Sequence, residues 1–379
     1  MKKILIDAVS LLSPLTGIGR YTYEISKCLQ KLSFGEYEIY FNYGYHSREL
    51  YRVNGSSQKE ERTKKIQTFI KKFPLLKKIS RYFYSYIAKF YKTTYDIYFQ
   101  PSFIPNKNIK AKKVICTVHD FSFKLQPYWH PKERIDYFNK NFDSVKKADH
   151  IITGSNFTKQ EIIRYMQIAD EKISVVYHGV NHDLYKEYPR YELQETKNKF
   201  DLREKFLLFA GSIEPRKNLL TLLKAYSLLK KEEKIPLVLV GFKGWENQEI
   251  MQEIRNNQEY IRYLGYVSDI ELAHIYNLST LFIYPSLYEG FGLPPLEAMA
   301  CGAAVVVSNA ASLPEVCGDA AIYVDPNDPM DIKNKISAAL RDEKLREDLS
   351  QKGKKQAALF SWEKSANEHF KVIKKVEEQ

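Results

Sequence analysis

The chain has 379 residues, and at about 150 residues per domain this length suggests two or three domains. Its hydrophobic fraction of 44% and charged fraction of 27% are typical of a soluble globular protein, and the sequence has no low-complexity segment. The formal net charge of +12 favours partners that carry negative charge, such as nucleic acid, anionic lipid or phosphorylated ligands.

Cysteine usage and apolar runs indicate the compartment. The 4 cysteines are scattered and form no C-x-x-C pair, so a reducing environment is indicated rather than a disulfide framework or a metal site. The apolar run at the N-terminus stops at Asp7, which is too short for a signal peptide. No apolar stretch reaches the roughly 18 residues needed to cross a membrane. We therefore expect a cytoplasmic protein.

The N-terminal half alternates short apolar runs with helical patterns. A strand is expected at 4–9, then a loop at 10–19, then a helix with apolar residues at helical spacing from Tyr21 to Leu32. Ser155 stands where the cap of another helix is expected. Further strands are expected at 114–118, 149–153 and 172–177.

The C-terminal half repeats this alternation after a polar, charged segment. Strands that alternate with helices form parallel sheets with β-α-β connections. The tail is expected to form a lone polar helix with Trp362 and Phe370 as its packing anchors. Strands are expected at 206–210, 237–240, 261–264, 281–284 and 304–307, and helices at 219–231 and 295–300.

These patterns predict an α/β protein with four parts. They are an N-terminal Rossmann-like domain at 1–185, a linker at 186–204, a C-terminal Rossmann-like domain at 205–360, and a helix at 361–379 that packs back toward the N-terminal domain.

The most informative run is YPSLYEGFGLPPLEAMAC at 284–301. Glu289 lies in a loop after a strand, and Glu297 lies about one turn into the next helix, whose start is marked by glycines and prolines. Exposed amides at a helix start bind anions, and carboxylates accept hydrogen bonds from hydroxyl groups. The pattern favours a nucleoside diphosphate sugar, with one glutamate at the ribose and the other at the sugar. The alternative is a solvated Glu289 and a Glu297 that only complements the helix dipole.

This segment resembles the E-x7-E motif of retaining glycosyltransferases of family 4, which have the GT-B fold of two Rossmann-like domains facing across a cleft. The resemblance covers essentially the whole chain, with a gap at about 44–95. The other matching segments are LFAGSIEPRKNLL at 208–220, 263–285, 312–326, GIGRY at 17–21, His119-Asp120, GSNFT at 154–158 and His178-Gly179-Val180.

The resemblance implies a role for each matching side chain. Glu289 would contact the donor sugar near its reacting face, and His119 would approach that sugar from the N-terminal domain. Glu297 would hold the ribose hydroxyls, and Lys217 would bind the diphosphate. Many members carry Gly-Arg where this chain has Gly-Ser at 211–212, so Arg216 would take over the second phosphate contact.

Backbone groups would complete the donor site. The amides of Gly290, Phe291, Gly292 and Leu293 would help to bind the phosphate and the sugar. In the first loop between a strand and a helix, Gly17 and Gly19 would let the backbone approach a ligand closely, with a simple turn as the alternative.

The departing diphosphate needs positive charge. Some glycosyltransferases use a metal held by Asp-x-Asp, but this motif does not occur in the sequence. We expect Arg216, Lys217 and a helix N-terminus to supply the charge, with no metal and no cofactor; a solvated pair at a helix start is the alternative.

A stretch from Arg62 to Lys92 contains ten basic residues and no acidic one, interleaved with aromatic and aliphatic residues. Such a stretch is typical of a segment that lies on an anionic membrane surface, which would place the protein on the inner face of the membrane. A solvated helix face over an aromatic core is the alternative. Nucleic acid is disfavoured because no nucleic-acid-binding motif accompanies the charge.

The leading hypothesis is a retaining hexosyltransferase. The combination of GIGRY, SIEPRKN and His-Asp looks like bacterial mannosyltransferases of O-antigen and capsule synthesis. This implies GDP-mannose as the donor and a glycan or polyprenyl-diphosphate-linked acceptor. UDP-glucose or another UDP-hexose is the alternative donor.

Three other functions remain as alternatives: a sugar-nucleotide epimerase, a dinucleotide-dependent oxidoreductase, and a non-catalytic basic protein that binds membrane or nucleic acid. The E-x7-E context argues against the epimerase. The oxidoreductase lacks the third glycine of its fingerprint, because that position is Thr22.

Overall fold

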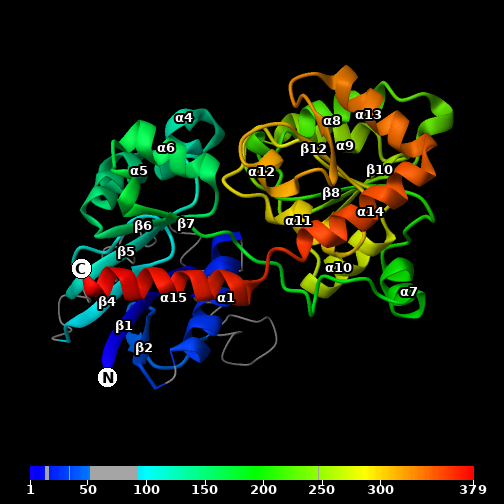
Figure 1. The fold of residues 1–379 in the computed structure, drawn as a ribbon. Helices are drawn as coiled ribbons and strands as arrows, with labels where there is room; N and C mark the ends of the chain where they lie inside the picture. The colour runs from blue at the N-terminus through cyan, green and yellow to red at the C-terminus, as the bar shows by residue number, and fades with distance from the viewer. Residues whose placement is uncertain (13–16, 34, 52–92, 246) are drawn as a thin grey trace.

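The fold is taken from a computed structural model that describes residues 1–12, 17–33, 35–51, 93–245 and 247–379. The basic stretch from Arg62 to Lys92, for which membrane contact is predicted, lies outside the described residues. The described strands form two sheets of parallel strands, and Figure 1 shows each sheet in its own α/β body.

The N-terminal sheet has seven strands in the order β3-β2-β1-β4-β5-β6-β7. All neighbours are parallel except β2 and β3, which pair antiparallel. The strands are β1 (Lys2–Asp7), β2 (Tyr37–Asn42), β3 (His46–Ser47), β4 (Tyr95–Gln100), β5 (Ala111–Val118), β6 (His150–Thr153) and β7 (Ile173–Val175). Its helices are α1 (Gly17–Leu32), α4 (Ser122–Leu125), α5 (Lys132–Asn141), α6 (Asn156–Met166) and α15 (Trp362–Glu378).

The C-terminal sheet has six parallel strands in the order β10-β9-β8-β11-β12-β13. The strands are β8 (Leu207–Ala210), β9 (Leu237–Val240), β10 (Ile261–Gly265), β11 (Leu281–Tyr284), β12 (Val305–Ser308) and β13 (Ala321–Val324). The helices are α7 (Arg190–Lys199), α8 (Leu219–Ser227), α9 (Gln248–Asn256), α10 (Asp269–Leu278), α11 (Leu293–Ala300), α12 (Leu313–Cys317), α13 (Pro329–Arg341) and α14 (Glu343–Ala357).

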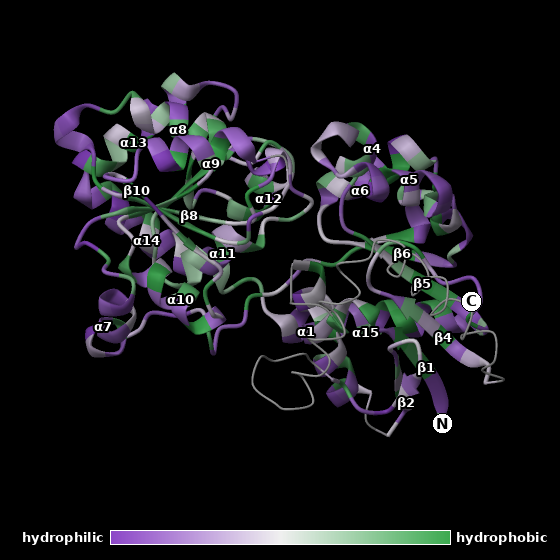
Figure 2. Ribbon diagram, turned by 180° about the vertical axis from the view of Figure 1, so that it is seen from behind, coloured by the Kyte–Doolittle hydropathy of each residue, from purple (hydrophilic) through white to green (hydrophobic). Residues whose placement is uncertain are grey.

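The strands are apolar because helices cover both faces of each sheet. Every residue of β8, β9, β11 and β12 is buried. Figure 2 shows the strands in the middle of both bodies in the hydrophobic colour, while α7 on the outside is mostly hydrophilic. In the described part of the chain, no helix is both long enough and apolar enough to cross a membrane.

The chain passes twice between the two bodies, and the two passages lie side by side. Val180 pairs with Ser361 in a parallel β-bridge, and the amide of Val180 donates to the carbonyl of Phe360 at 3.2 Å. A Cβ atom on Gly179 would lie 2.2 Å from the backbone nitrogen of Trp362, so no other residue fits this contact without a shift of the backbone. After the second passage, α15 packs against α1 of the N-terminal body (Figure 1).

Helix α15 is more apolar on its inner face than a lone polar helix. Trp362 is buried, as expected of an anchor, and Phe370 is partly buried against the same core. His369 and Ile373 are also buried, at helical spacing. The inward-facing residues of this helix form a narrow stripe and are separated in the sequence by polar residues, which is why the sequence looks uniformly polar.

The segment 186–204, expected to be a linker, differs from that expectation because it contains a packed helix. In α7, Leu193 and Thr196 are buried, and the Thr196 hydroxyl lies 2.8 Å from Nδ1 of His274 on α10. Only these two residues of the helix are buried, and Lys199 pairs with Glu271 of α10 at 2.5 Å, so the overall composition of the helix stays polar. The segment is thus part of the C-terminal body.

Candidate functional site

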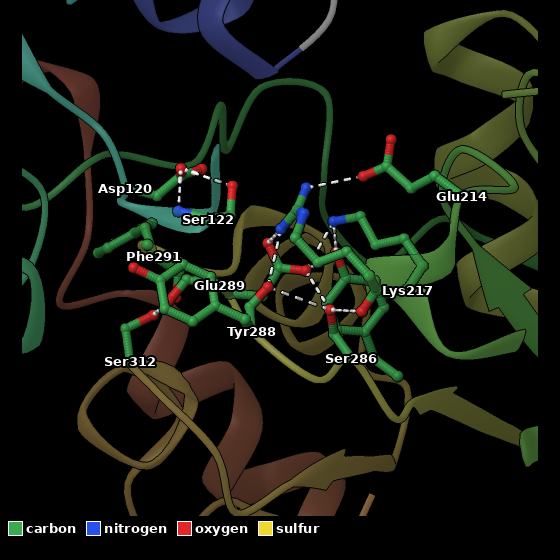
Figure 3. Close-up of polar contacts among 12 residues, drawn as sticks. Asp120, Ser122, Glu214, Lys217, Ser286, Tyr288, Glu289, Phe291 and Ser312 are labelled. Carbon is green, nitrogen blue, oxygen red and sulfur yellow. Dashed lines mark hydrogen bonds and ion pairs between the residues drawn. The ribbon is translucent and has the colours of Figure 1, made fainter. Parts of the chain in front are cut away.

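Glu289 lies in the loop after β11, at the carboxyl edge of the C-terminal sheet, where open parallel sheets bind ligands. Its Oε1 accepts hydrogen bonds from Lys217 Nζ at 2.6 Å, from the Ser286 hydroxyl at 2.5 Å and from the Tyr284 hydroxyl at 3.0 Å. Its Oε2 accepts a hydrogen bond from Arg216 at 2.7 Å. Figure 3 shows Lys217 and Ser286 pointing toward the Glu289 carboxylate. The structure therefore brings together three predicted site residues, Glu289, Arg216 and Lys217.

The two cations set the protonation state of this carboxylate. Burial alone would raise the pKa of Glu289, but Arg216 and Lys217 lower it to about 2. Burial and the neighbouring Arg216 lower the pKa of Lys217. An ionised carboxylate only accepts hydrogen bonds, so Glu289 can bind hydroxyl groups or cations but cannot donate a proton.

Arg216 is held by a second carboxylate as well. Its guanidinium donates to Glu214 at 2.9 Å and to the carbonyl of Tyr288 at 2.8 Å. Glu214 is 4% exposed, so both cations are balanced by two buried carboxylates, Glu214 and Glu289. This arrangement fixes the directions of both cationic side chains before any anion arrives.

Gly290 brings the two bodies into contact at this site. A Cβ atom on Gly290 would lie 1.8 Å from the carbonyl oxygen of His119, so the close approach requires glycine. The carbonyl of Gly290 accepts a hydrogen bond from the Ser155 hydroxyl at 2.7 Å. Ser155 also caps α6 by accepting from the Thr158 amide, as the sequence predicts.

His119 follows β5, directly opposite this loop. Its Nε2 lies 2.8 Å from the carbonyl of Pro101, and since a carbonyl only accepts, Nε2 carries the proton. Burial lowers the pKa of His119, which keeps the ring neutral at neutral pH. Tyr21 and Phe103 pack edge-on against the ring with centroids 5.0 Å and 5.3 Å away. Because Nε2 donates to Pro101, the other ring nitrogen of His119, Nδ1, can accept a hydrogen bond.

Glu297 lies on α11 and is 4% exposed. It forms an ion pair with Arg20 of α1, which belongs to the other body. The second terminal nitrogen of Arg20 pairs with Asp269 at 2.8 Å, and its first also donates to the Tyr185 hydroxyl at 2.8 Å. The predicted ribose-binding carboxylate thus faces a cation from the N-terminal body.

The start of α11 has the geometry that the glycines and prolines predict. Gly292 is its N-cap with φ +109°, a conformation that favours glycine, and a proline follows in the first turn. The Phe291 ring packs against His178 with centroids 4.7 Å apart. The Ser312 hydroxyl donates to the carbonyls of Glu289 at 2.8 Å and of Phe291 at 2.9 Å, which fixes the backbone before Leu293, the first residue of the helix.

Gly17 and Gly19 differ from their expected place in a loop. Gly17 is the first residue of α1 and Gly19 lies in its first turn. A Cβ atom on Gly17 would meet no atom within 4 Å, so no described neighbour requires glycine there. The helix starts earlier than its apolar pattern because the first inward-facing residue, Gly19, has no side chain.

Sequence reasoning missed three charged residues of this region. Glu214 and Arg20 lie in segments that match the family, SIEPRKN and GIGRY. Glu214 pairs with Arg216, two positions away, whereas Arg20 pairs with Asp269 and Glu297, 249 and 277 positions away. Glu315 accepts from the amides of Asn156 and Phe157 on the opposite body at 2.7 Å and 3.1 Å. A single charged residue gives no sign in the sequence that its partner lies in the other domain. Among the described residues, no group of three or more His, Cys, Asp or Glu side chains is placed to hold a metal ion.

Two parallel-sheet bodies with an anion-suited site between them define a GT-B glycosyltransferase. Solved structures agree with this fold: the Anabaena protein HepE, in its crystal structure with UDP and glucose, has a TM-score of 0.68 and 17% sequence identity, covering 99% of this chain and 100% of that chain.

The chain belongs to the glycosyltransferases of family 4. The family described as Glycosyltransferase Family 4 matches residues 15–184, and the one described as Glycosyl transferases group 1 matches residues 191–356. The O-antigen chain mannosyltransferase B of Escherichia coli is 36% identical over 98% of this chain and 99% of that protein. The serotype-specific mannosyltransferase WbdA of Escherichia coli is 36% identical over 74% of this chain, which corresponds to 35% of that longer protein.

Proposed function

We propose that this glycosyltransferase moves mannose from GDP-mannose, with retention of configuration and without a metal ion, onto a glycan or polyprenyl-diphosphate-linked acceptor in cell-surface polysaccharide synthesis. The choice of sugar is supported by the mannosyltransferase relatives, one of which matches over nearly its full length. The chemistry is supported by one observation above all, the buried cluster of Glu289 with Arg216 and Lys217.

In the proposed reaction the bond between the anomeric carbon and the β-phosphate oxygen breaks, and its electrons leave with the diphosphate of GDP. An acceptor hydroxyl oxygen forms the new bond to the anomeric carbon and gives its proton to the departing diphosphate. Arg216 and Lys217 are placed to neutralise this negative charge, which is the largest electrostatic demand of the step. The phosphate of the donor would bind Arg216 and Lys217, whose side chains Glu289 and Glu214 already hold in place. Such preorganised charge stabilises the departing group without reorganisation during the reaction.

Glu289 is proposed to accept a hydrogen bond from a hydroxyl of the donor sugar. Its carboxylate oxygens already bind two cations and two hydroxyl groups, which reduces its strength as a nucleophile and favours a binding role. His119 would accept from another sugar hydroxyl through Nδ1, because Nε2 is committed to Pro101. Glu297 would accept from the ribose, and the amides of 290–293, in the loop before α11 and at its first residue, would face the phosphate and sugar.

The donor is tested by thermal shift with GDP, UDP, ADP and NAD, followed by mass spectrometry of products formed from GDP-mannose and from UDP-hexoses. Stabilisation by GDP and transfer from GDP-mannose are expected. Transfer only from a UDP-hexose would replace mannose in the proposal. The anomeric configuration of the product, determined by NMR, tests retention: an α-mannoside is expected from the α-linked donor.

The proposed localisation is the inner face of the membrane. It rests on sequence alone, on the ten basic residues between Arg62 and Lys92 and on the lipid-linked class of acceptor. The proposed domains are 1–185 and 205–360, with the segment at 186–204 joined to the C-terminal domain by the packing of α7 on α10 and the helix at 361–379 belonging to the N-terminal domain by its packing on α1.

A further inference from the structure

Arg20 makes contacts that connect four separate parts of the chain. It lies on α1, one residue after the second glycine of the GIGRY motif. One end of its guanidinium pairs with Glu297 on α11 and also donates to Tyr185, while the other end pairs with Asp269 at the start of α10. The guanidinium fork therefore holds two carboxylates of the C-terminal body at once.

Of the three charged side chains in this cluster, Glu297 is much more buried than Arg20 and Asp269. The side chains of Arg20 and Asp269 are 20% and 28% exposed, whereas that of Glu297 is 5% exposed. An exposed ion pair contributes little, but a buried carboxylate without a partner is strongly disfavoured. Glu297 is the member of the cluster that depends on Arg20.

Resting on the proposed function, we infer that Arg20 is a positioning residue for the donor nucleotide: it orients the Glu297 carboxylate and supplies its counter-cation, so that the carboxylate can accept hydrogen bonds from the ribose hydroxyls. The ribose site is then assembled from both bodies, with the carboxylate supplied by one and its counter-cation by the other.

The other groups near Glu297 strengthen its dependence on Arg20. Asp269 and Tyr276 of α10, Tyr185, and Cys301 after α11 interact with Glu297, and none of them is a cation. Burial raises the pKa of Glu297, and Arg20 opposes this rise. Without Arg20, the nearby Asp269 would raise the pKa of Glu297 further. A protonated carboxyl offers fewer acceptor sites to a ribose diol than a carboxylate does.

The test measures the Kd for GDP of wild type, Arg20→Gln and Arg20→Lys between pH 6 and pH 9 by calorimetry. Arg20→Gln should raise the Kd by about tenfold at pH 7, which corresponds to about 1.4 kcal/mol of binding free energy, and the loss should shrink as the pH rises. Arg20→Lys keeps the positive charge but lacks the guanidinium that pairs with two carboxylates at once, so the Kd for GDP should rise less than in Arg20→Gln. Arg48→Gln is the matched control, because Arg48 pairs with Glu38 on the surface of the same body; it should leave the Kd unchanged.

Inorganic pyrophosphate provides the second readout, since it has no ribose. Its affinity should be the same in wild type and Arg20→Gln. In a double-mutant cycle, Arg20→Gln should have no further effect on the GDP Kd once Glu297→Gln is present. If Arg20→Gln does not fold, Arg20→Lys and the cycle built on it carry the same test.

Three outcomes overturn the inference. If the Kd for GDP is unchanged at every pH, the Arg20–Glu297 ion pair only holds the two bodies together and has no role in donor binding. A lower Kd means that Arg20 competes with the ribose for Glu297. Weaker pyrophosphate binding makes Arg20 a phosphate contact. If the wild type binds no nucleoside diphosphate at all, the proposed function fails and this inference fails with it, whereas wild-type binding with any of the three outcomes removes only the role of Arg20.

Discussion

Gly290 and His119 belong to different bodies of the protein, yet the α-carbon of Gly290 lies so close to the carbonyl of His119 that an added Cβ atom would be 1.8 Å from the oxygen. The residue before Gly290 is Glu289, and the carbonyl that it meets belongs to the other proposed catalytic residue. The position of the Glu289 and His119 side chains, both proposed to be catalytic, relative to each other therefore depends on the absence of a methyl group at Gly290.

Gly290→Ala should force the two bodies apart at this point and lower kcat/KM by about 10- to 100-fold, since a displacement of about 1 Å can cost a hundredfold. Steady-state transfer assays measure this effect. In Gly211→Ala the added methyl would meet only Phe209 and Tyr284, at 3.6 Å to 3.8 Å, so that variant should unfold at the wild-type temperature. Wild-type turnover in Gly290→Ala would contradict the close approach.

Glu289→Gln should lower turnover by at least about tenfold, the effect of losing about 1.4 kcal/mol of transition-state stabilisation. The amide cannot balance Arg216 and Lys217 and is a weaker acceptor for a sugar hydroxyl. Glu297→Gln is the matched change, and it should weaken donor binding more than turnover. A folded Glu289→Gln enzyme with near-wild-type kcat would disprove the assigned role.

The low pKa of Glu289 predicts how stability changes with pH. Its pKa is about 2 in the folded protein against an ordinary value of 4.5, so its ionisation stabilises the fold fully above about pH 5, and this stabilisation is lost as the pH falls toward 2. The shift corresponds to about 3 kcal/mol at most, and the buried cation Lys217 offsets part of it. The difference in unfolding free energy between wild type and Glu289→Gln, measured by urea denaturation, should be constant from pH 5 to 7 and shrink below pH 4.5. A difference that grows on acidification would contradict the pairing.

Chelation tests the source of positive charge. If Arg216 and Lys217 neutralise the leaving diphosphate, transfer should persist in excess EDTA, and Lys217→Ala should lower kcat/KM by about 10²- to 10³-fold, the range for one lost electrostatic contact. Activity that disappears with EDTA and returns with magnesium or manganese, together with a mild Lys217→Ala effect, would mean that a metal ion supplies the charge.

Membrane binding is predicted from the sequence between Arg62 and Lys92. The protein should sediment with anionic vesicles and be released by high salt, because each basic residue near such a surface contributes about 1 kcal/mol that salt screens. Replacing Lys71, Lys72, Lys77 and Lys78 by Gln should weaken sedimentation and leave GDP affinity unchanged. Equal sedimentation of both proteins would favour a solvated helix face instead.

Local patterns were enough to predict five of the six strands of the C-terminal sheet, all except β13. The expected bounds of β9 and β11 are those of the structure, because a fully buried strand is a continuous apolar run between polar turns. The start of α11 was predicted to within two residues, because proline has a fixed φ that suits the first turn of a helix and glycine can adopt the positive φ found at Gly292. What failed was the weaker signal of α7, where two inward residues in a charged helix resemble a linker.

The site was predictable where its residues lie in one segment, as Glu289 and Glu297 do. It was not predictable where pairs join distant segments. Arg20 meets Glu297 across 277 positions, and Glu315 meets Asn156 across 159. These pairs depend on how two bodies face each other, and a pattern in one segment carries no information about that arrangement.

The two segments that connect the bodies pair at Val180 and Ser361, and this pairing limits how parts of the protein can be exchanged with those of a relative. Helix α15 packs into the N-terminal core beside α1. A fragment that ends before Trp362 would therefore expose to water the buried residues that α15 covers, such as Tyr21. A chimera that exchanges donor specificity between relatives must therefore replace an internal cassette and keep both chain ends from one parent. Gly179 must stay with the tail that it contacts, so the natural crossover points for such an exchange lie just after Val180 and just before Phe360.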